Sequence, residues 1–233
     1  MTPILVLLFG VAPTTAVGTD LWFAAITKLF GASVHKKKNS VDWQVVRRLC
    51  LGSLPASIVT LVGLYLLGGE KIRDGLILNM LGLVMILTAG ALLFKDRLHG
   101  IGKHLRQDTP ESFKRLQPAM TVVAGAVLGC LVSLTSIGAG ALGAVMLLYL
   151  YPLRMTSARI VGTDIVHAIP LTIVAGIGHL LLGNVNYGLL LSLLIGSIPG
   201  VMLGALLSSR VPETVLRGML AVVLVGVDWK MLG

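Results

Sequence analysis

The sequence predicts an all-α, polytopic membrane protein built as a bundle of helices. Hydrophobic residues make up 55% of the 233 residues and charged residues only 12%, a composition too apolar for a soluble domain. Four stretches without Asp, Glu, Lys or Arg reach the ~20 residues that a helix needs to cross the hydrocarbon core: 49–69, 75–94, 117–153 and 165–209. Alternating polar residues are absent from them, which favours helices over strands.

The expected elements fall into two halves separated by a basic segment. A short segment at 3–12 and helices at 16–34, 45–67 and 74–94 form a first transmembrane repeat, residues 1–94. Residues 95–118 are expected to form a basic cytoplasmic loop. The second repeat, residues 119–233, has helical stretches at 119–135, 140–150, 159–182, 187–207 and 213–232.

The stretch 119–150 is expected to contain a break. As one helix it would measure about 48 Å, against ~30 Å of hydrocarbon. Its weakest part is 133–143, where small residues hold a helix poorly and hydroxyl groups can satisfy freed backbone groups. A second break is expected at 12–15, which reads Ala-Pro-Thr-Thr. Broken or re-entrant helices are therefore part of the predicted fold.

The two halves repeat each other at a fixed offset of 144 residues. Residues 17–73 align without a gap on 161–217, so that Val-Gly-Thr-Asp and Gly-Ser-x-Pro each occur twice. Helix breakers and polar groups at matching places are typical of transporters built from structural repeats, with the site where the halves meet. Met1 aligns with Val145, so the first half lacks a counterpart of 119–144, its opening helix. We expect translation to begin upstream of Met1; a truncated gene is the alternative.

The charges of the loops alternate oppositely in the two halves. The first half has an uncharged, a strongly basic and a balanced loop in that order, whereas the second half has a basic, an uncharged and a net basic loop. Under the positive-inside rule this order favours homologous, inverted repeats, and parallel repeats are the alternative. The net charge of +9 lies mainly in 35–48 and 95–115. We therefore interpret it as membrane topology and expect no nucleic-acid partner.

The order of these motifs resembles the TauE/SafE family of sulfite and organosulfonate exporters. Both halves show a small-residue turn into Val-Gly-Thr, a helix ending near a His and then Gly-Ser-x-Pro, and the second half also shows the Gly-rich break. The resemblance implies a permease that moves a small sulfur-containing anion, such as sulfite, a sulfonate or sulfoacetate, across the bacterial inner (plasma) membrane. Its partners would be that anion and the lipid bilayer, and a homo-oligomer is compatible with it.

The chain departs from the family pattern in two places. The first helix is absent, and 136–140 reads Ser-Ile-Gly-Ala-Gly where the family more often has Gly-Ile-Gly-Gly-Gly.

Two aspartates lie at equivalent places inside expected helices. A carboxylate at membrane depth costs at least ~2.5 kcal/mol, so Asp20 and Asp164 are expected to face the bundle interior. We predict that they bind and release a proton as the anion passes, with His167 as a relay one turn after Asp164. One alternative is that each aspartate caps a helix N-terminus near the interface. Another is a cation transporter that uses the pair.

The anion is predicted to contact small and hydroxyl residues at broken helix ends, where backbone N–H groups are available. These residues are Gly18, Thr19, Gly162, Thr163, Ser136, Gly138 and Gly140. Ordinary helix capping by the two threonines is the alternative.

Lys28 is the cation in the middle of an expected span, eight residues beyond Asp20 on the same helix face. It attracts the anion, pairs with Asp20 or extends to the interface. His35 and His179 end equivalent helices and are interpreted as interfacial residues.

No nucleotide-binding loop, metal-ligand cluster or nucleophile constellation is visible in the sequence. We therefore expect no enzyme activity, cofactor or metal. A membrane enzyme, or a scaffold that acts through 95–115, is the competing class.

Overall fold

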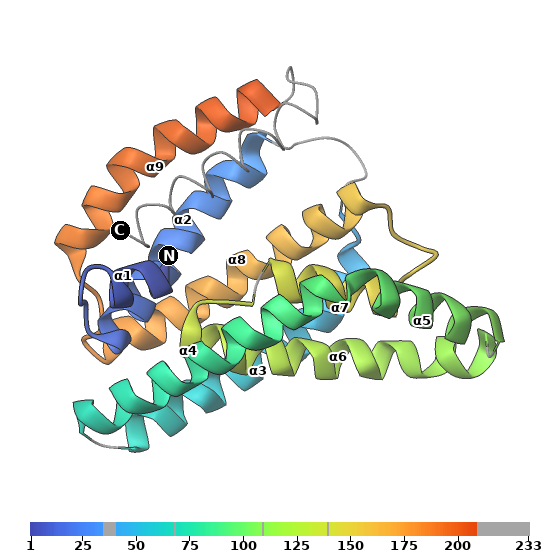
Figure 1. Cartoon of the computed structure of the whole chain (residues 1–233), viewed down its shortest axis with the longest axis horizontal. Helices are drawn as coiled ribbons and strands as arrows, with labels where there is room; N and C mark the ends of the chain where they lie inside the picture. The colour runs from blue at the N-terminus through green and yellow to red at the C-terminus, as the bar shows by residue number, and fades with distance from the viewer. Residues whose placement is uncertain (35–40, 68, 109, 139, 209–233) are drawn as a thin grey trace.

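Every regular element that the structure describes is an α-helix (Figure 1). The computed structural model describes residues 1–34, 41–67, 69–108, 110–138 and 140–208. The helices are α1 (Thr2–Leu7), α2 (Pro13–Val34), α3 (Trp43–Leu66), α4 (Glu70–Leu93), α5 (Lys95–Asp108), α6 (Pro110–Thr135), α7 (Ala141–Leu150), α8 (Ser157–Leu181) and α9 (Tyr187–Ser208). The all-α prediction is confirmed. The expected helix at 213–232 and His35 lie outside the described residues.

Four of the described helices are long and apolar enough to cross a membrane. They are Trp43–Leu66, Glu70–Leu93, Arg115–Thr135 and Ala158–Leu181. Large apolar side chains remain exposed on their outer faces; Val59 is 71% exposed and Ile86 73%. Lipid tails, not water, match such a surface. The protein is therefore a multi-pass membrane protein.

The predicted break in the second half is confirmed. Between the end of α6 and the start of α7, Ser136, Gly138 and Gly140 have φ angles of 56°, 120° and 136°. These left-handed conformations interrupt the helix and suit glycine. The break in the first half lies earlier than expected, because Pro13 is already the first residue of α2. At that position its missing N–H costs no helical hydrogen bond.

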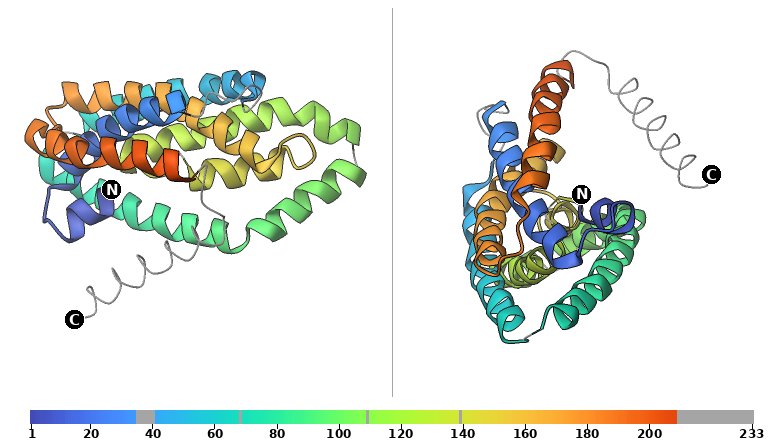
Figure 2. Two further views of the ribbon diagram at one scale, coloured as in Figure 1. Left: turned by 90° about the horizontal axis from the view of Figure 1, so that it is seen from above. Right: turned by 90° about the vertical axis from the view of Figure 1, so that its left-hand side faces the viewer.

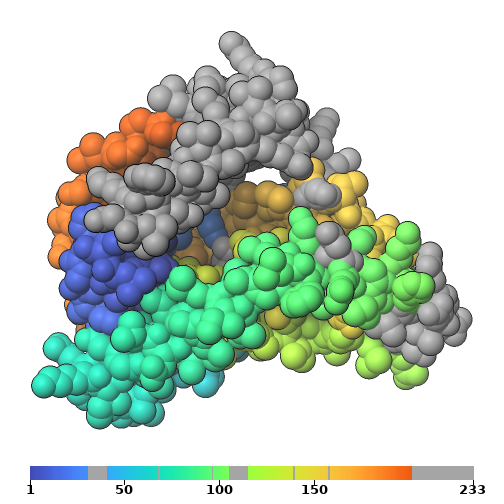
Figure 3. Space-filling model, viewed as in Figure 1, coloured from blue at the N-terminus to red at the C-terminus, as the bar shows by residue number. Residues whose placement is uncertain are grey.

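The prediction of a loop at 95–118 is wrong, because α5 and the start of α6 occupy this segment. α5 packs on α7: Gly102 lies directly against the carbonyl group of Tyr149, and the imidazole of His99 lies 3.4 Å from the carbonyl oxygen of Leu148. This contact with a helix distant in sequence stabilises the charged segment as an amphipathic helix. α4 and α5 together form a ridge along the near face of the molecule (Figure 3).

α3 and α6 run parallel in close contact. Gly125 of α6 lies against the backbone of Leu49, and Gly129 lies against the backbone of Ser53. A Cβ atom at either glycine would overlap the carbonyl oxygen of its partner. Two glycines four residues apart therefore allow the helix backbones to approach, as is common between membrane helices.

α2 and α8, which are equivalent helices of the two repeats, run antiparallel. Gly18, near the start of α2, lies against the carbonyl group of Asn184, just beyond the end of α8. One turn further along α2, the indole of Trp22 donates to the carbonyl oxygen of Gly176 at 3.0 Å. Later residues of α2 therefore contact earlier residues of α8.

The helix boundaries and neighbours repeat as well. α2 and α8 begin 144 residues apart, and so do α3 and α9. α9 lies beside α2 (Figures 1 and 2), and α3 lies beside α8. Repeats related by an axis along the membrane normal would keep equivalent helices parallel, whereas inverted repeats make them antiparallel. These contacts support the predicted inverted repeat, whose orientation in the membrane stays a prediction.

A buried apolar core lies where the two halves meet. It joins α2 and α8 with α3, α4 and α6 through Val17, Leu21, Leu64, Ile77, Val132, Leu171 and Ala175. Asp20, Asp164 and His167 of the candidate site lie on two of these helices, α2 and α8.

Candidate functional site

The two Gly-Thr-Asp triplets lie inside α2 and α8. Their threonines are fully buried, and their aspartates are each 4% exposed. The prediction that Gly18-Thr19 and Gly162-Thr163 lie at broken helix ends is wrong. Pro13 starts α2, and the Thr156 side chain caps α8, in both cases more than one turn before the triplet. The backbone N–H groups of the triplets therefore lie within helical turns.

The threonine hydroxyls contact the opposite repeat. The N–H of Asn186 donates to Oγ1 of Thr19 at 3.1 Å, and the N–H of Asp42 donates to Oγ1 of Thr163 at 2.9 Å. Asn186 and Asp42 in turn cap α9 and α3, because their side chains accept from backbone N–H groups three residues on. These exchanged contacts join the halves at both ends of the bundle. Each hydroxyl also has a hydrogen to donate, so a role in anion contact stays a prediction.

Asp164 lies at the first turn of α7, and His167, one turn further along α8, contacts α3. His167 is fully buried, and its Nε2 lies 2.9 Å from the hydroxyl oxygen of Ser53 in α3. Gly143 lies so close to Asp164 that a Cβ atom there would overlap the carboxylate oxygen Oδ1. Glycine therefore allows the carboxylate to reach the backbone near the N-terminus of α7, where the helix dipole favours negative charge.

Three buried polar atoms in this part of the chain have no hydrogen-bond partner among the described residues: Oδ1 of Asp164, Nδ1 of His167 and Oγ of Ser136. The N–H of Gly143 donates to the carbonyl oxygen of Gly138 at 3.1 Å, so the break and Asp164 meet at one turn. A buried polar group without a partner costs roughly 1–3 kcal/mol and indicates a bound water or ligand. A carboxylate, an imidazole and a hydroxyl suit a small oxyanion that carries a proton.

Lys28 of α2 lies close enough to Asp164 and Asp20 to interact electrostatically with both carboxylates. Asp20 is hydrogen-bonded by Thr2, whose N–H and hydroxyl donate to Oδ2 at 2.8 and 2.7 Å. The amino group of Met1 lies 3.1 Å from the same oxygen. Lys28 thus lies within electrostatic range of both aspartates predicted to bind the proton. Of the two, Asp164 has the buried oxygen without a hydrogen-bond partner.

Further buried polar groups continue along α8 beyond this region. The Ser133 hydroxyl of α6 donates to the Ser57 hydroxyl of α3 at 2.7 Å. The His179 imidazole donates to the carbonyl oxygen of Ser133 at 2.8 Å, and Asn184 lies 3.4 Å from the other ring nitrogen. His179 lies in the last turn of α8, as expected, and is fully buried within the bundle, while its place at the membrane interface stays a prediction. The backbone of α6 provides the partner that allows this ring to be buried.

The sequence analysis assigned no role to Ser53 and Ser57 and placed Ser133 in the predicted break, whereas α6 continues through Ser133 to Thr135. Ser53 belongs to the repeated Gly-Ser-x-Pro motif, and that repetition was a signal for it. The contact between Ser57 and Ser133 has no comparable signal, because it depends on the register between α3 and α6.

The described residues contain no group of three metal-ligating side chains. An apolar groove between α6 and α7, lined in part by Val123, Val127 and Met146, does not include the polar residues of the candidate site.

Comparison with known proteins confirms the family resemblance. The family model described as "Sulfite exporter TauE/SafE" matches residues 1–231. The chain is 40% identical over 214 residues to "Probable membrane transporter protein YjnA" of Bacillus subtilis (strain 168), covering 90% of this chain and 81% of the relative. It is 29% identical over 221 residues to "Probable membrane transporter protein YdhB" of the same organism, covering 92% of this chain and 82% of the relative. No solved structure matches. The protein is therefore a membrane transporter of the TauE/SafE family.

Proposed function

We propose that this transporter moves a small sulfur-containing oxyanion, such as sulfite or an organosulfonate, together with a proton across the bacterial inner membrane. The observation that carries the proposal is the pair of buried atoms without partners, Oδ1 of Asp164 and Nδ1 of His167. The two residues are three apart and therefore share one face of α8. The description of the matching family, a sulfite exporter, supports the choice of anion.

The chemistry of this pair favours an anion that travels with a proton. An ionised Asp164 only accepts hydrogen bonds and repels a bare oxyanion, whereas a protonated Asp164 donates one to it. Lys28 contributes positive charge beside the carboxylate, and the first turn of α7 contributes its dipole. Because Ser53 contacts Nε2 of His167, the Nδ1 atom remains for the anion. Nδ1 donates to the anion in one tautomer and accepts from a protonated anion in the other.

The break contributes the remaining wall of this proposed site. Ser136 supplies a buried hydroxyl without a described partner, and Gly138 and Gly140 supply a backbone without side chains. Gly18 has a different role, because it lies against the carbonyl group of Asn184 and permits the close approach of the repeats.

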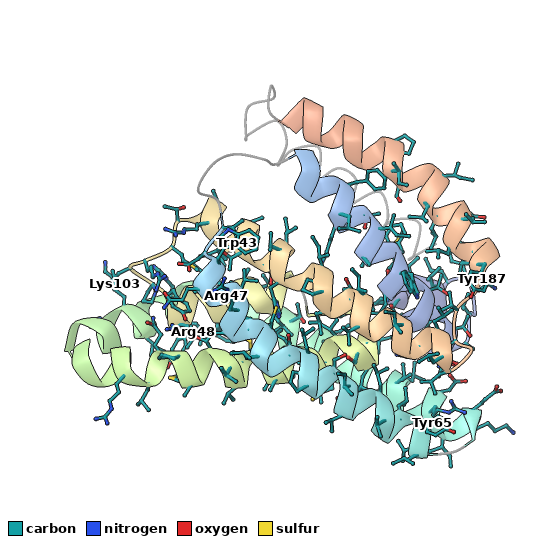
Figure 4. The ribbon with its side chains drawn as sticks, turned by 180° about the vertical axis from the view of Figure 1, so that it is seen from behind. Trp43, Arg47, Arg48, Tyr65, Lys103 and Tyr187 are labelled. Carbon is teal, nitrogen blue, oxygen red and sulfur yellow. The ribbon has the colours of Figure 1, made fainter. Side chains whose placement is uncertain are left out.

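We further propose that the end at which α3 and α8 begin faces the cytoplasm. Arg47, Arg48 and Lys103 gather at that end, whereas Tyr65 and Tyr187 lie at the opposite end (Figure 4). This distribution follows the positive-inside rule and the enrichment of tyrosine at membrane interfaces.

The proposed substrate is tested by flux into proteoliposomes that contain the purified protein. Sulfite or sulfoacetate should enter faster than into protein-free vesicles, and an acid exterior should accelerate uptake. Charge movement induced by a cation, with no response to either anion, would reject the proposal. That result would favour the alternative of a cation transporter that uses the aspartate pair.

A further inference from the structure

The two exchanged contacts between the repeats differ in charge. At one end Asp42 caps α3 and its N–H donates to Thr163, and at the other end Asn186 caps α9 and its N–H donates to Thr19. Asn and Asp cap helices about equally well, so capping alone does not require a carboxylate at position 42. The charge at this end therefore needs a separate explanation.

Two arginines contact the Asp42 carboxylate. Nη2 of Arg154 lies 2.8 Å from Oδ2 and donates to Oδ1 at 3.1 Å, while Nη2 of Arg159 lies 3.6 Å from Oδ2. Nε of Arg159 is buried and has no hydrogen-bond partner within the described ranges. The positions equivalent to the two arginines hold Gly10 and Thr15. This ionic cluster of Asp42, Arg154 and Arg159 is thus specific to one end of the repeat pair.

The ionic cluster carries one more positive than negative charge, and solvent reaches it from the arginine side. The side chains of Arg154 and Arg159 are 42% and 38% exposed, whereas that of Asp42 is 3% exposed. A guanidinium group binds a sulfite or sulfonate through the same forked hydrogen bonds that it offers a carboxylate. Arg47 and Arg48 lie at the same end and add to the positive potential (Figure 4).

We propose that Arg154 and Arg159 form an oxyanion subsite, in which the transported anion replaces the Asp42 carboxylate as the partner of the arginines and loosens the contact between α3 and α8. The proposal rests on the function proposed above, because the anion is that transporter's substrate. Nε of Arg159 provides a donor that Asp42 leaves unused. Two contacts of α3 remain: Nη2 of Arg154 donates to Oε1 of Gln44 at 2.9 Å, and the Asp42 N–H donates to Thr163, the residue next to Asp164. Anion binding at the surface thereby acts on the helix that carries the buried site.

The separation of α3 from α8 near Asp42 can be measured as a distance between two spin labels on the whole purified chain. One pair of labels spans the contact at Asp42, and a second pair occupies the equivalent positions at Asn186. The labelled residues are all exposed: Trp43 with Leu153, and Tyr187 with Phe9. Cys50 and Cys130 are replaced by alanine in every variant. Sodium sulfite and sodium phosphate are the probes, and sodium chloride at equal ionic strength is the control.

Sulfite should lengthen the 43–153 distance in the parent and leave the 187–9 distance unchanged. Asp42→Asn keeps the cap, so it should show the lengthened distance without sulfite. It should also bind sulfite about fivefold more tightly, the upper order for losing a competing, partly exposed ion pair. Arg159→Gln should weaken sulfite binding about tenfold, as expected for a lost hydrogen bond to a charged group. Asn186→Asp, the matched control, should respond like the parent.

Two results would overturn the subsite: an equal sulfite response in Asp42→Asn and the parent, or equal lengthening of both label pairs. Failure of the proposed function is distinguishable from failure of the subsite. If phosphate lengthens the 43–153 distance and sulfite does not, the subsite stands and the sulfur substrate is wrong. If sulfite is transported but neither probe changes the distance, the function stands and the subsite is wrong.

Discussion

Gly143→Ala tests whether the Asp164 carboxylate lies against the first turn of α7. The added methyl carbon would overlap Oδ1 of Asp164 and lie 3.1 Å from its Cγ. Because non-bonded heavy atoms prefer about 3.5–4.0 Å, helix and carboxylate must move apart. Overpacking of this kind costs about 1–3 kcal/mol, and the better helix propensity of alanine offsets up to ~1 kcal/mol of it. We expect a net loss of about 1 kcal/mol in the free energy of unfolding, together with slower anion transport.

A double-mutant cycle in mixed micelles measures this contact. The free energy of unfolding is determined for the parent, Gly143→Ala, Asp164→Ala and the double variant. Since Asp164→Ala removes the overlapping oxygen, Gly143→Ala should be harmless in that background, which gives a coupling of about 1–2 kcal/mol. Gly82→Ala in α4 is the control, because a Cβ atom there meets nothing within 4 Å. Equal effects of Gly143→Ala in the two backgrounds would refute the reasoning.

Two further predictions concern the helix contacts. Thr163→Val removes the acceptor of the Asp42 N–H, and we expect it to cost about 1 kcal/mol in unfolding free energy and to slow sulfite flux. Thr19→Val removes the equivalent contact with Asn186 and should have a similar effect on unfolding free energy and on flux. Unchanged flux in both variants would contradict a role of these two threonine contacts in transport. Gly129→Leu should separate α3 from α6 and lower the free energy of unfolding by about 3 kcal/mol or more, since the added side chain meets backbone. Gly63→Leu on α3, where nothing lies within 4 Å, is its control, and equal thermal stability of these two variants would count against the helix contact.

The composition and the repeat predicted much of the fold. Apolar runs located the spans, and the excess length of 119–150 over the hydrocarbon core placed a break that the structure has between Thr135 and Ala141. The segment 95–118 was predicted wrongly because its charge suggests a solvated loop. Its helix depends on packing of Gly102 against α7, and local sequence does not reveal such a contact.

The candidate site was predictable in its residue types and less so in its contacts. Intramembrane aspartates are costly, which singled out Asp20 and Asp164 from sequence. Which of them keeps an oxygen without a partner depends on Thr2 and Gly143, whose positions come from the three-dimensional packing. Ser133, whose carbonyl oxygen accepts from His179, also contacts Ser57. This contact depends on the register between α3 and α6 and was missed for the same reason.

The central claim is that Asp164 carries the proton that accompanies the anion. The most direct test is the initial rate of sulfite flux as a function of pH in proteoliposomes, for the parent, Asp164→Asn and Asp20→Asn at the equivalent position. Asp164→Asn should still bind sulfite but show a flux that no longer depends on pH. Asp20→Asn should keep the pH dependence and lose stability, because Thr2 loses a charged acceptor. A flux–pH profile of Asp164→Asn that overlays the parent's would contradict the account and leave Asp164 without a role in proton coupling.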